Sequence, residues 1–350
     1  MTFTDHSLGA KQHDQYPSTR FMGSKRKLLE KIWNVASQFQ YNTVIDLFAG
    51  SGVVSYMFKS HGKRVISNDH MHMSWQYAKA MIENNRRQLS DVTVDRLLNK
   101  KPKTNKFVEK TFSGLYYSDA DNRLIDQLRF NIGAMTNPYD RAIATAALMR
   151  ACTKKRARGI FTYVGFRYND GRRDLLMPLD QHFRLAVKAI NNAVFDNEQR
   201  NLAICSDALN VKTSKNALVY MDPPYYSPLS DNEYVRRYHL IEGIARGWKG
   251  VKIQDHTKTK KFASYTTPFS SRQGASDAFN SLFKRFNNNI LLVSYASNGL
   301  PTMDEIIELM SRYKTHVDVI PLKHRYSFGN QGHKVKNNNN AVSEYLFLGH

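Results

Sequence analysis

The chain has 350 residues, of which 51 are Lys or Arg and 30 are Asp or Glu, so its formal net charge is +21. So large a positive charge argues against an enzyme of small metabolites and favours a polyanionic partner, most simply nucleic acid. No apolar run approaches the roughly 20 residues that span a bilayer, and the N-terminus lacks a secretion-signal pattern, so we expect a cytoplasmic protein without a membrane partner.

The first part of the chain alternates predicted helices and strands. The spacing of apolar residues predicts a helix over 28–35, and a short apolar run predicts a strand over 43–46. A helix over 53–59, a strand over 64–67 and a long helix over 71–87 follow. This alternation is typical of a doubly wound, mostly parallel α/β sheet.

The alternation stops at residue 88. Residues 88–199 are basic and mainly helical in pattern, with one predicted β-hairpin over 159–168 that turns through 169–171. Strands are then predicted over 202–205, 217–220, 290–294, 317–320 and 341–348. We therefore predict one α/β domain, built from 1–87 and 200–350, that is interrupted by an inserted module over 88–199.

A glycine motif, Asp46-Leu-Phe-Ala-Gly-Ser-Gly52, joins the first predicted strand to a helix. Gly50 and Gly52 allow a tight turn and a close approach to a ligand. A nicotinamide-type site would place a third glycine where Ser55 stands, and no Gly-Lys-Ser/Thr phosphate loop is present. A purely structural turn is the alternative to a ligand site of another kind.

Acidic residues follow three of the predicted strands. Asp46 ends the first strand, Asp69 comes after the second, and Asp207 follows the strand over 202–205. Doubly wound sheets bind ligands beyond the carboxyl ends of their strands, so we expect these acids to line a crevice there. Each acid taken singly could equally cap a helix.

The most specific motif is Asp222-Pro-Pro-Tyr225, directly after the strand over 217–220 and Met221. Proline fixes φ and lacks a backbone donor, so the Asp222 carboxylate and the Pro223 carbonyl form a stiff pair of acceptors beside an aromatic ring. That arrangement suits an amino group on a planar heterocycle. A Pro-rich structural loop is the alternative.

In this order, the two motifs resemble the hallmarks of S-adenosylmethionine-dependent, N6-adenine-specific DNA methyltransferases. The segment 20–29 resembles an extra cofactor-binding motif of the D12 class (the Dam-like, α-type group), whose target-recognition region lies between the two hallmarks. With Tyr238-His-Leu240 and the tail 322–348, the resemblance covers most of the chain from about residue 17. The central region departs from Dam-like members, so their target sequence is not implied.

The resemblance implies a Rossmann-like methyltransferase fold and assigns roles to particular residues. Asp46 and 48–52 would hold the methionine end of the cofactor, Asp69 its ribose and Asp207 its adenine amine. The remaining cofactor contacts would come from Met22, Gly23 and Lys25, although Lys25 could instead belong to a solvated face. The implied cofactor residues are Met22, Gly23, Lys25, Asp46, Phe48, Ala49, Gly50, Gly52, Asp69 and Asp207.

The catalytic motif would act on an adenine that is flipped out of the duplex. Asp222 and Pro223 would grip the hydrogens of the exocyclic amine and direct its lone pair at the sulfonium methyl for in-line transfer. Pro224 keeps the loop stiff, and Tyr225 would stack on the flipped base. This chemistry needs no metal, and the two cysteines are too few for a metal site.

Basic residues around the predicted hairpin are the candidate DNA contacts. They are expected to touch phosphates, with arginine able to read guanine, whereas a merely solvated basic face is the alternative. The candidates are Lys154, Lys155, Arg156, Arg158, Arg172 and Arg173.

The leading hypothesis is therefore a site-specific adenine methyltransferase that acts on double-stranded DNA in restriction-modification or DNA marking. A cognate restriction endonuclease would act separately, and both a monomer and a dimer stay open. An RNA adenine-N6 methyltransferase, an N4-cytosine enzyme and a non-catalytic nucleic-acid-binding module are the alternatives.

Overall fold

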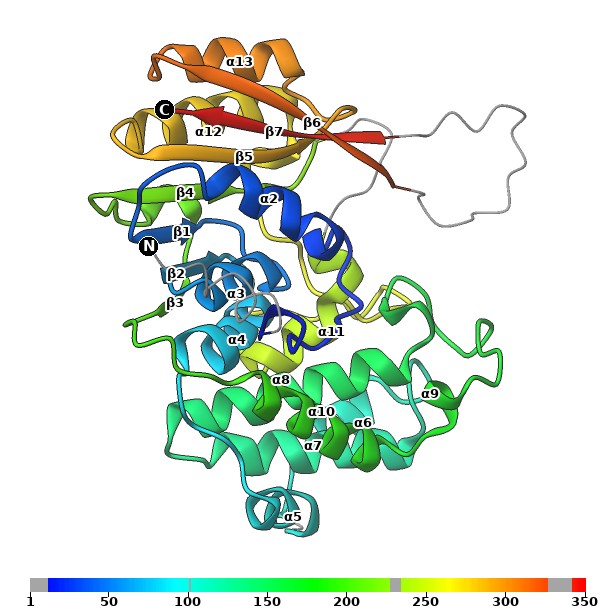
Figure 1. Ribbon diagram of the computed structural model, residues 1–350. Helices are drawn as coiled ribbons and strands as arrows, with labels where there is room; N and C mark the ends of the chain where they lie inside the picture. Colours follow the sequence, from blue (N-terminus) through cyan, green and yellow to red (C-terminus); the bar gives the residue numbers. More distant parts are fainter. Residues whose placement is uncertain (1–11, 101, 227–233, 327–341) are drawn as a thin grey trace. The chain divides into compact units, whose positions relative to one another are not determined.

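The computed structural model describes residues 12–100, 102–226, 234–326 and 342–350 (Figure 1). Seven strands form a mixed sheet in the order β3-β2-β1-β4-β5-β7-β6. The predicted α/β fold class is confirmed. The chain divides into two compact units, which we call the first unit (Met1–Ser24, Ala49–Cys205, Glu233–Tyr265) and the second unit (Lys25–Phe48, Ser206–Asn232, Thr266–His350).

The first unit contains two parallel strands, β2 (Arg64–Asp69) and β3 (Leu202–Cys205), which run in register from Ile66 opposite Leu202 to Asp69 opposite Cys205. Helices and irregular loops make up the rest of the unit. Among the described residues, no helix is both long and apolar enough to cross a bilayer. Its helices are α3 (Val53–Ser60), α4 (His72–Ala78) with the π-helical turn η2 (Lys79–Glu83), α5 (Asp91–Asn99), α6 (Phe107–Thr111), α7 (Asp119–Gly133), α8 (Pro138–Lys155), η3 (Ala157–Gly159), α9 (Arg173–Leu176), α10 (Leu179–Ala193) and α11 (Tyr234–Arg246).

The second unit contains the other five strands. Strands β1 (Thr43–Asp46), β4 (Ala217–Met221) and β5 (Ile290–Ala296) are parallel, whereas β7 (Val342–Gly349) runs antiparallel to both β5 and β6 (Val317–Tyr326). Every residue of β4 is buried, which is typical of a parallel strand covered on both faces. Its helices are η1 (Lys25–Leu28), α2 (Leu29–Ala36), η4 (Ala208–Asn210), η5 (Pro268–Ser270), α12 (Arg272–Arg285) and α13 (Met303–Ser311).

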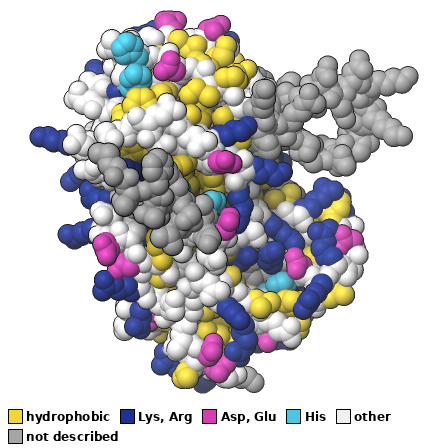
Figure 2. Space-filling view, in the orientation of Figure 1, with side chains coloured by type: hydrophobic (Ala, Val, Ile, Leu, Met, Phe, Trp, Pro, Cys, Tyr) yellow, Lys and Arg dark blue, Asp and Glu magenta, His cyan; other side chains and the backbone are white. Residues whose placement is uncertain are grey.

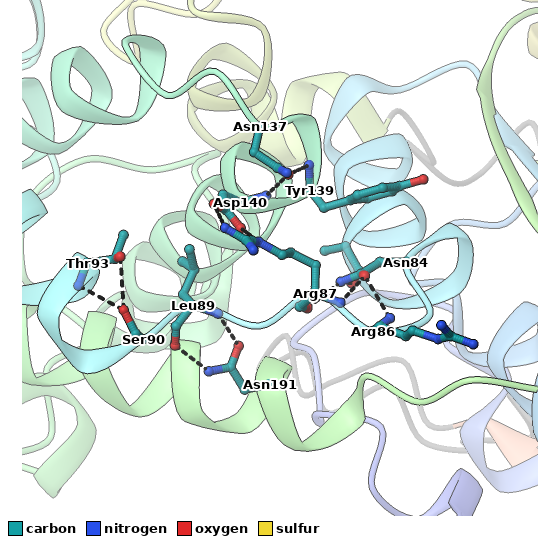
Figure 3. Close-up of polar contacts among 11 residues, drawn as sticks. Asn84, Arg86, Arg87, Leu89, Ser90, Thr93, Asn137, Tyr139, Asp140 and Asn191 are labelled. Atoms are coloured by element: carbon teal, nitrogen blue, oxygen red, sulfur yellow. Dashed lines mark hydrogen bonds and ion pairs between the residues drawn. The ribbon is translucent and has the colours of Figure 1, made fainter.

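All seven predicted strands are present, and so are the predicted helices over 28–35 and 53–59. The long helix predicted over 71–87 is shorter than expected, because it ends at Glu83. Asn84 adopts an extended conformation with ψ of 119°, and its side-chain oxygen accepts hydrogen bonds from the amides of Arg86 (3.2 Å) and Arg87 (2.8 Å) (Figure 3). Arg87 then forms an ion pair with Asp140 at the start of α8, with a nitrogen–oxygen distance of 2.6 Å (Figure 3). The Asn84 side chain thus bonds to backbone amides that would otherwise continue the helix, so the helix ends and the chain turns.

The β-hairpin predicted over 159–168 is wrong, because these residues form no strand. The buried guanidinium of Arg156 donates hydrogen bonds to the carbonyls of Tyr163 (2.6 Å) and Gly165 (2.8 Å), which a hairpin ladder would need for itself. Gly159 and Gly165 also adopt positive φ angles of 68° and 76°, which no strand accommodates. The segment is an irregular loop wound around one arginine.

Candidate active site

The loop Asp222–Tyr225 leaves the buried end of β4 in the second unit and meets a buried lysine. The Lys25 ammonium lies 2.9 Å from Asp222 Oδ1 and 2.7 Å from the Tyr225 hydroxyl. The Tyr225 hydroxyl is also 3.0 Å from Asp222 Oδ1. In the resemblance Lys25 belongs with the cofactor residues, whereas the structure places its charge against Asp222 and Tyr225.

A second carboxylate completes this cluster from the far end of the sequence. Glu344 of β7 is fully buried, and its Oε1 lies 2.9 Å from the Lys25 ammonium and 2.8 Å from the Tyr225 hydroxyl. Ser294 of β5 donates a hydrogen bond of 2.6 Å to the same oxygen. Since Tyr225 has a single hydroxyl proton, it donates to Asp222 or to Glu344 but not to both at once.

Glu344 and Ser294 are absent from the sequence-based predictions. A signal was present: Glu344 is the one charged residue in the otherwise apolar and polar-neutral strand 342–349, where a charge pointing into the core needs a partner. The identity of that partner, 319 positions earlier at Lys25, could come only from the fold.

The electrostatics of Asp222 follow from burial and these neighbours. Burial raises the pKa of Asp222 to about 6; the Lys25 charge opposes that rise and the Glu344 charge adds to it. Both polar contacts of Asp222 within the described chain use Oδ1. Its Oδ2 is therefore the oxygen that can accept a hydrogen bond from a substrate.

The Tyr225 ring is held in one orientation. It packs edge-to-face on Tyr295 with ring centroids 4.8 Å apart, and the Tyr295 hydroxyl donates a 2.7 Å hydrogen bond to the Leu300 carbonyl. Pro223 is buried and Pro224 is half-buried. The loop thus combines an anchored aromatic ring with a carboxylate whose inner oxygen is fixed.

The other predicted residues of the second unit lie as follows. Asp46 is fully buried as the last residue of β1, opposite Tyr220 of the parallel strand β4, which Asp222 directly follows. Phe48 packs edge-to-face on Phe269 at 5.4 Å. Asp207 caps η4 by accepting a 2.8 Å hydrogen bond from the Leu209 amide, which is the structural role considered for it from the sequence.

The glycine turn lies in the first unit, where it is tied to the end of β2. Asp69 Oδ2 accepts a 2.7 Å hydrogen bond from the Gly50 amide, and Oδ1 accepts one of 2.8 Å from the Met71 amide. The Ala49 amide bonds to the Asn68 carbonyl at 2.8 Å. The structure thus brings the predicted residues Ala49, Gly50 and Asp69 together, and burial raises the pKa of Asp69 to about 6.

Both glycines of the turn are required by their surroundings. Gly50 and Gly52 adopt φ angles of 51° and 80°, which favour glycine. A Cβ at Gly50 would lie 3.1 Å from the Phe21 ring, and one at Gly52 would lie 2.7 Å from the Tyr16 hydroxyl. The turn is therefore packed beneath aromatic residues from the start of the chain.

The predicted residues Met22 and Gly23 lie beside these aromatic residues, also in the first unit. The Tyr238 hydroxyl accepts a 2.9 Å hydrogen bond from the Met22 amide and donates one of 3.0 Å to the Arg20 carbonyl. Gly23 has a φ of 73°, and a Cβ there would lie 3.1 Å from the Tyr234 hydroxyl. Helix α11 thus fixes the N-terminal motif.

The predicted DNA contacts divide by exposure. Arg156 is 2% exposed and fills the loop interior, so we remove it from the candidates. Lys154 and Lys155 are half-buried, and Lys155 bonds to the Met177 carbonyl at 2.7 Å. The exposed candidates are Arg158, Arg172 and Arg173.

The exposed candidates lie in a surface loop around α9: Arg158 and Arg172 precede this helix, and Arg173 is its first residue. Figure 2 shows Lys and Arg side chains in this region together with hydrophobic ones. Arg158 stacks over the Tyr168 ring at 4.0 Å, and Phe166 in the same loop is 52% exposed. Arg172 is paired with Asp170.

A comparison with known families decides the identity of the chain. The profile described as D12 class N6 adenine-specific DNA methyltransferase matches residues 21–297. The chain belongs to this family. The D12-class resemblance carried by the glycine motif and Asp222–Tyr225 is thereby confirmed.

Curated relatives of this D12-class chain are modification enzymes. It is 27% identical to the type II methyltransferase M2.HphI of Haemophilus parahaemolyticus over 95% of this chain and 98% of that protein. It is 26% identical to the modification methylase LlaI of Lactococcus lactis subsp. lactis over 84% of this chain. It is 26% identical to the type II methyltransferase M.FokI of Planomicrobium okeanokoites over 94% of this chain. The chain spans only 49% and 52% of the last two relatives.

Proposed function

We propose that this chain transfers a methyl group from S-adenosylmethionine to N6 of adenine in double-stranded DNA, as the modification enzyme of a restriction-modification system. The observation that carries the proposal is Asp222, whose Oδ1 is held by Lys25 beside the anchored Tyr225 ring while no described residue bonds to Oδ2. Membership of the D12 class favours this over an RNA enzyme, an N4-cytosine enzyme and a non-catalytic module.

The residues of the loop account for the proposed chemistry. The lone pair of an aromatic amine is delocalised into its ring, so the amine is a poor nucleophile until its hydrogens are gripped. Asp222 Oδ2 and the Pro223 carbonyl accept those two hydrogens, and the stiff Pro223-Pro224 backbone keeps the acceptors in place. Tyr225 stacks on the flipped base. Once the nitrogen becomes cationic, Asp222 takes the departing proton.

The proposed cofactor residues fit a ligand with an amine and ribose hydroxyls. The carboxylates of Asp46 and Asp69 stand at strand ends, and the tight glycine turn is held against Asp69 through the Gly50 amide. When bound, S-adenosylmethionine supplies the electrophilic methyl group. We retain Met22, Gly23, Asp46, Phe48, Ala49, Gly50, Gly52, Asp69 and Asp207 as its proposed binding residues, and we move Lys25 to the catalytic cluster.

Gly52→Ala is expected to destabilise the glycine turn by about 1–3 kcal/mol and to weaken cofactor binding, because the new methyl meets both a positive φ and the Tyr16 hydroxyl. Gly62→Ala is the matched control: its φ of 74° is similar, but no atom lies within 4 Å of the added methyl. Thermal unfolding and calorimetric titration with S-adenosylmethionine measure both effects. Equal losses in the two variants would show that the packing against Tyr16 is unimportant.

The turnover number is expected to fall as the pH drops through about 6. Burial raises the pKa of Asp222 to about 6, so below that pH the carboxyl is protonated and loses an acceptor. Well below pH 6 the decline should approach tenfold per pH unit. Because burial also raises the pKa of Asp69 to about 6, the profile should be measured at saturating cofactor, which isolates the catalytic loop. A flat profile between about pH 5 and 8 would contradict the role of Asp222.

We propose that DNA binds to the loop around α9 through Arg158, Arg172 and Arg173, with Lys154 and Lys155 as lesser contributors. Arg158→Ala and Arg173→Ala should each weaken DNA binding and reduce the slope of log affinity against log salt by about 1. Arg86→Ala is the control, because this arginine is 85% exposed but pairs with Asp196 away from the loop. An unchanged slope in both loop variants would place the DNA elsewhere.

The domain prediction stands as part of the proposal. Residues 88–199 would form the target-recognition region, and 1–87 with 200–350 the catalytic domain. The enzyme would work in the cytoplasm on the DNA it protects, with a cognate endonuclease acting separately.

Methyl transfer to polymers tests the proposed function. Tritiated S-adenosylmethionine is incubated with the enzyme and with duplex DNA, single-stranded DNA or ribosomal RNA, and long-read sequencing of DNA from expressing cells locates the modified base. We expect incorporation into duplex DNA and one N6-methyladenine motif. Incorporation into RNA alone, or into no polymer, would overturn the proposal.

A further inference from the structure

Resting on the proposed function, we propose that Glu344 is a positioning residue of the active site: it shares the Lys25 charge with Asp222 and anchors Tyr225, so that Asp222 Oδ2 is aimed at the substrate amine. Glu344 touches neither of the reacting atoms in this proposal. It acts through Lys25 and Tyr225, both of which contact Asp222.

The geometry surrounds the Lys25 ammonium with acceptors. An ammonium has three donors, and the described acceptors near this one include Asp222 Oδ1 and Glu344 Oε1, each at 2.9 Å, and the Tyr225 hydroxyl at 2.7 Å. A lysine side chain is long and flexible, so each added partner restricts the position of its head group. The partner from β7 thus helps to fix the ammonium and with it the inner oxygen of Asp222.

Glu344 is itself held where a carboxylate is costly. It has no exposed surface, and among the described residues nothing donates a hydrogen bond to its Oε2. Its Oε1 accepts from Ser294 at 2.6 Å. A fully buried acid with one unsatisfied oxygen contributes little to stability by itself, so its place beside the catalytic motif points to a functional role.

The charge balance gives Glu344 its effect on Asp222. One ammonium is shared by two carboxylates, so Asp222 is neutralised only in part and remains a strong acceptor. Among the described residues, the other ionisable groups that interact with Asp222 include the Tyr225 and Tyr220 hydroxyls, and burial raises the pKa of both well above the usual value, so they stay neutral. Asp46, the last residue of β1, also interacts electrostatically with Tyr220.

Glu344→Gln keeps the shape of the side chain and removes its charge. Of the two carboxylates, only Asp222 then shares the Lys25 charge, so the turnover number should fall about tenfold or more, because the acceptor is weakened. The acidic limb of the pH profile should move to lower pH by about half a unit or more, because the Glu344 charge no longer raises the pKa of Asp222. The KM for DNA and the affinity for S-adenosylmethionine should not change.

Ser294→Ala should shift the acidic limb of the pH profile in the opposite direction. Without the serine hydroxyl, the Glu344 charge is less dispersed and draws Lys25 away from Asp222, so the acidic limb should move to higher pH. This variant keeps every charge and tests the same network if Glu344→Gln does not fold. Glu308→Gln on α13, an exposed acid paired with Arg312, is the control for loss of one charge.

The wild-type enzyme is assayed first, with methyl transfer to duplex DNA as the readout. If it transfers no methyl group, the proposed function and this inference both fail. If it is active, an acidic limb that stays in place in both Glu344→Gln and Ser294→Ala overturns the inference and leaves the function standing. A loss of activity that only follows the unfolded fraction, or appears in KM alone, also overturns it.

Discussion

Asp222→Asn should lower the rate of methyl transfer by about 10²–10³-fold, the usual cost of removing one preorganised electrostatic group. Asparagine keeps the size of the side chain, but its amide can present a donor to the substrate amine and carries no charge. Lys25 retains Glu344 at 2.9 Å, so the cluster should still form and the protein should still fold. Single-turnover transfer of a tritiated methyl group measures the rate.

Asp318→Asn is the control for Asp222→Asn, because Asp318 is 61% exposed on β6 and lies in the same unit. Its rate should equal that of the wild type. Cofactor affinity should be similar in all three proteins, since Asp222 is assigned to the substrate. A rate within about threefold of wild type for Asp222→Asn would remove Asp222 from the mechanism.

The sheet could be predicted from the sequence because its strands are short apolar runs with clear boundaries. The five residues of β4 are all apolar or aromatic and all buried, and β1 ends at the acid that opens the glycine motif. Local pattern and tertiary position agree in these segments, so the pattern alone is sufficient.

The loop around Arg156 shows where local pattern fails. Alternating residues and an Asn-Asp-Gly turn predict a hairpin over 159–168, but the buried guanidinium takes the carbonyls of Tyr163 and Gly165. An arginine outside the segment thus decides its conformation. Charge counting also misread Arg156 as a DNA contact, because the sequence does not reveal which basic residue of a cluster is buried.

The sequence motifs of the candidate site could be predicted, but the contacts between residues far apart in the sequence could not. Four adjacent residues single out Asp222 and Tyr225 as candidates, and positions at or after successive strands single out Asp69 and Gly50. Lys25 and Glu344 meet only because η1 and β7 lie in one unit, although they are separated by most of the chain. A contact between residues so far apart cannot be predicted from local sequence patterns. The one local signal is Glu344, an acid in an otherwise apolar and polar-neutral strand.

Lys25→Met is expected to destabilise the second unit strongly. Methionine fills a similar volume but leaves Asp222 and Glu344 as two carboxylates around an apolar side chain, where breaking a buried pair costs about 3–5 kcal/mol. Methyl transfer should be lost as well, because Asp222 Oδ1 loses its strongest partner. Urea unfolding at neutral pH measures the first effect and single-turnover transfer the second.

The pH dependence of Lys25→Met separates electrostatics from packing. Burial already raises the folded-state pKa of Asp222 to about 6, above its unfolded value, and losing Lys25 should raise it further. The folded state of the variant then binds a proton at higher pH than the wild type does, so the stability deficit should shrink as the pH falls from that raised pKa towards about 6, and should stay constant at lower pH. Glu344→Gln added to Lys25→Met should recover part of the stability at neutral pH, because only one buried carboxylate remains. Lys212→Met, at an exposed lysine, should stay within about 0.5 kcal/mol of wild type. A deficit that is the same at pH 5 and pH 8, unrelieved by Glu344→Gln, would mean that Lys25 acts through packing of its stem and that the two carboxylates do not depend on its charge.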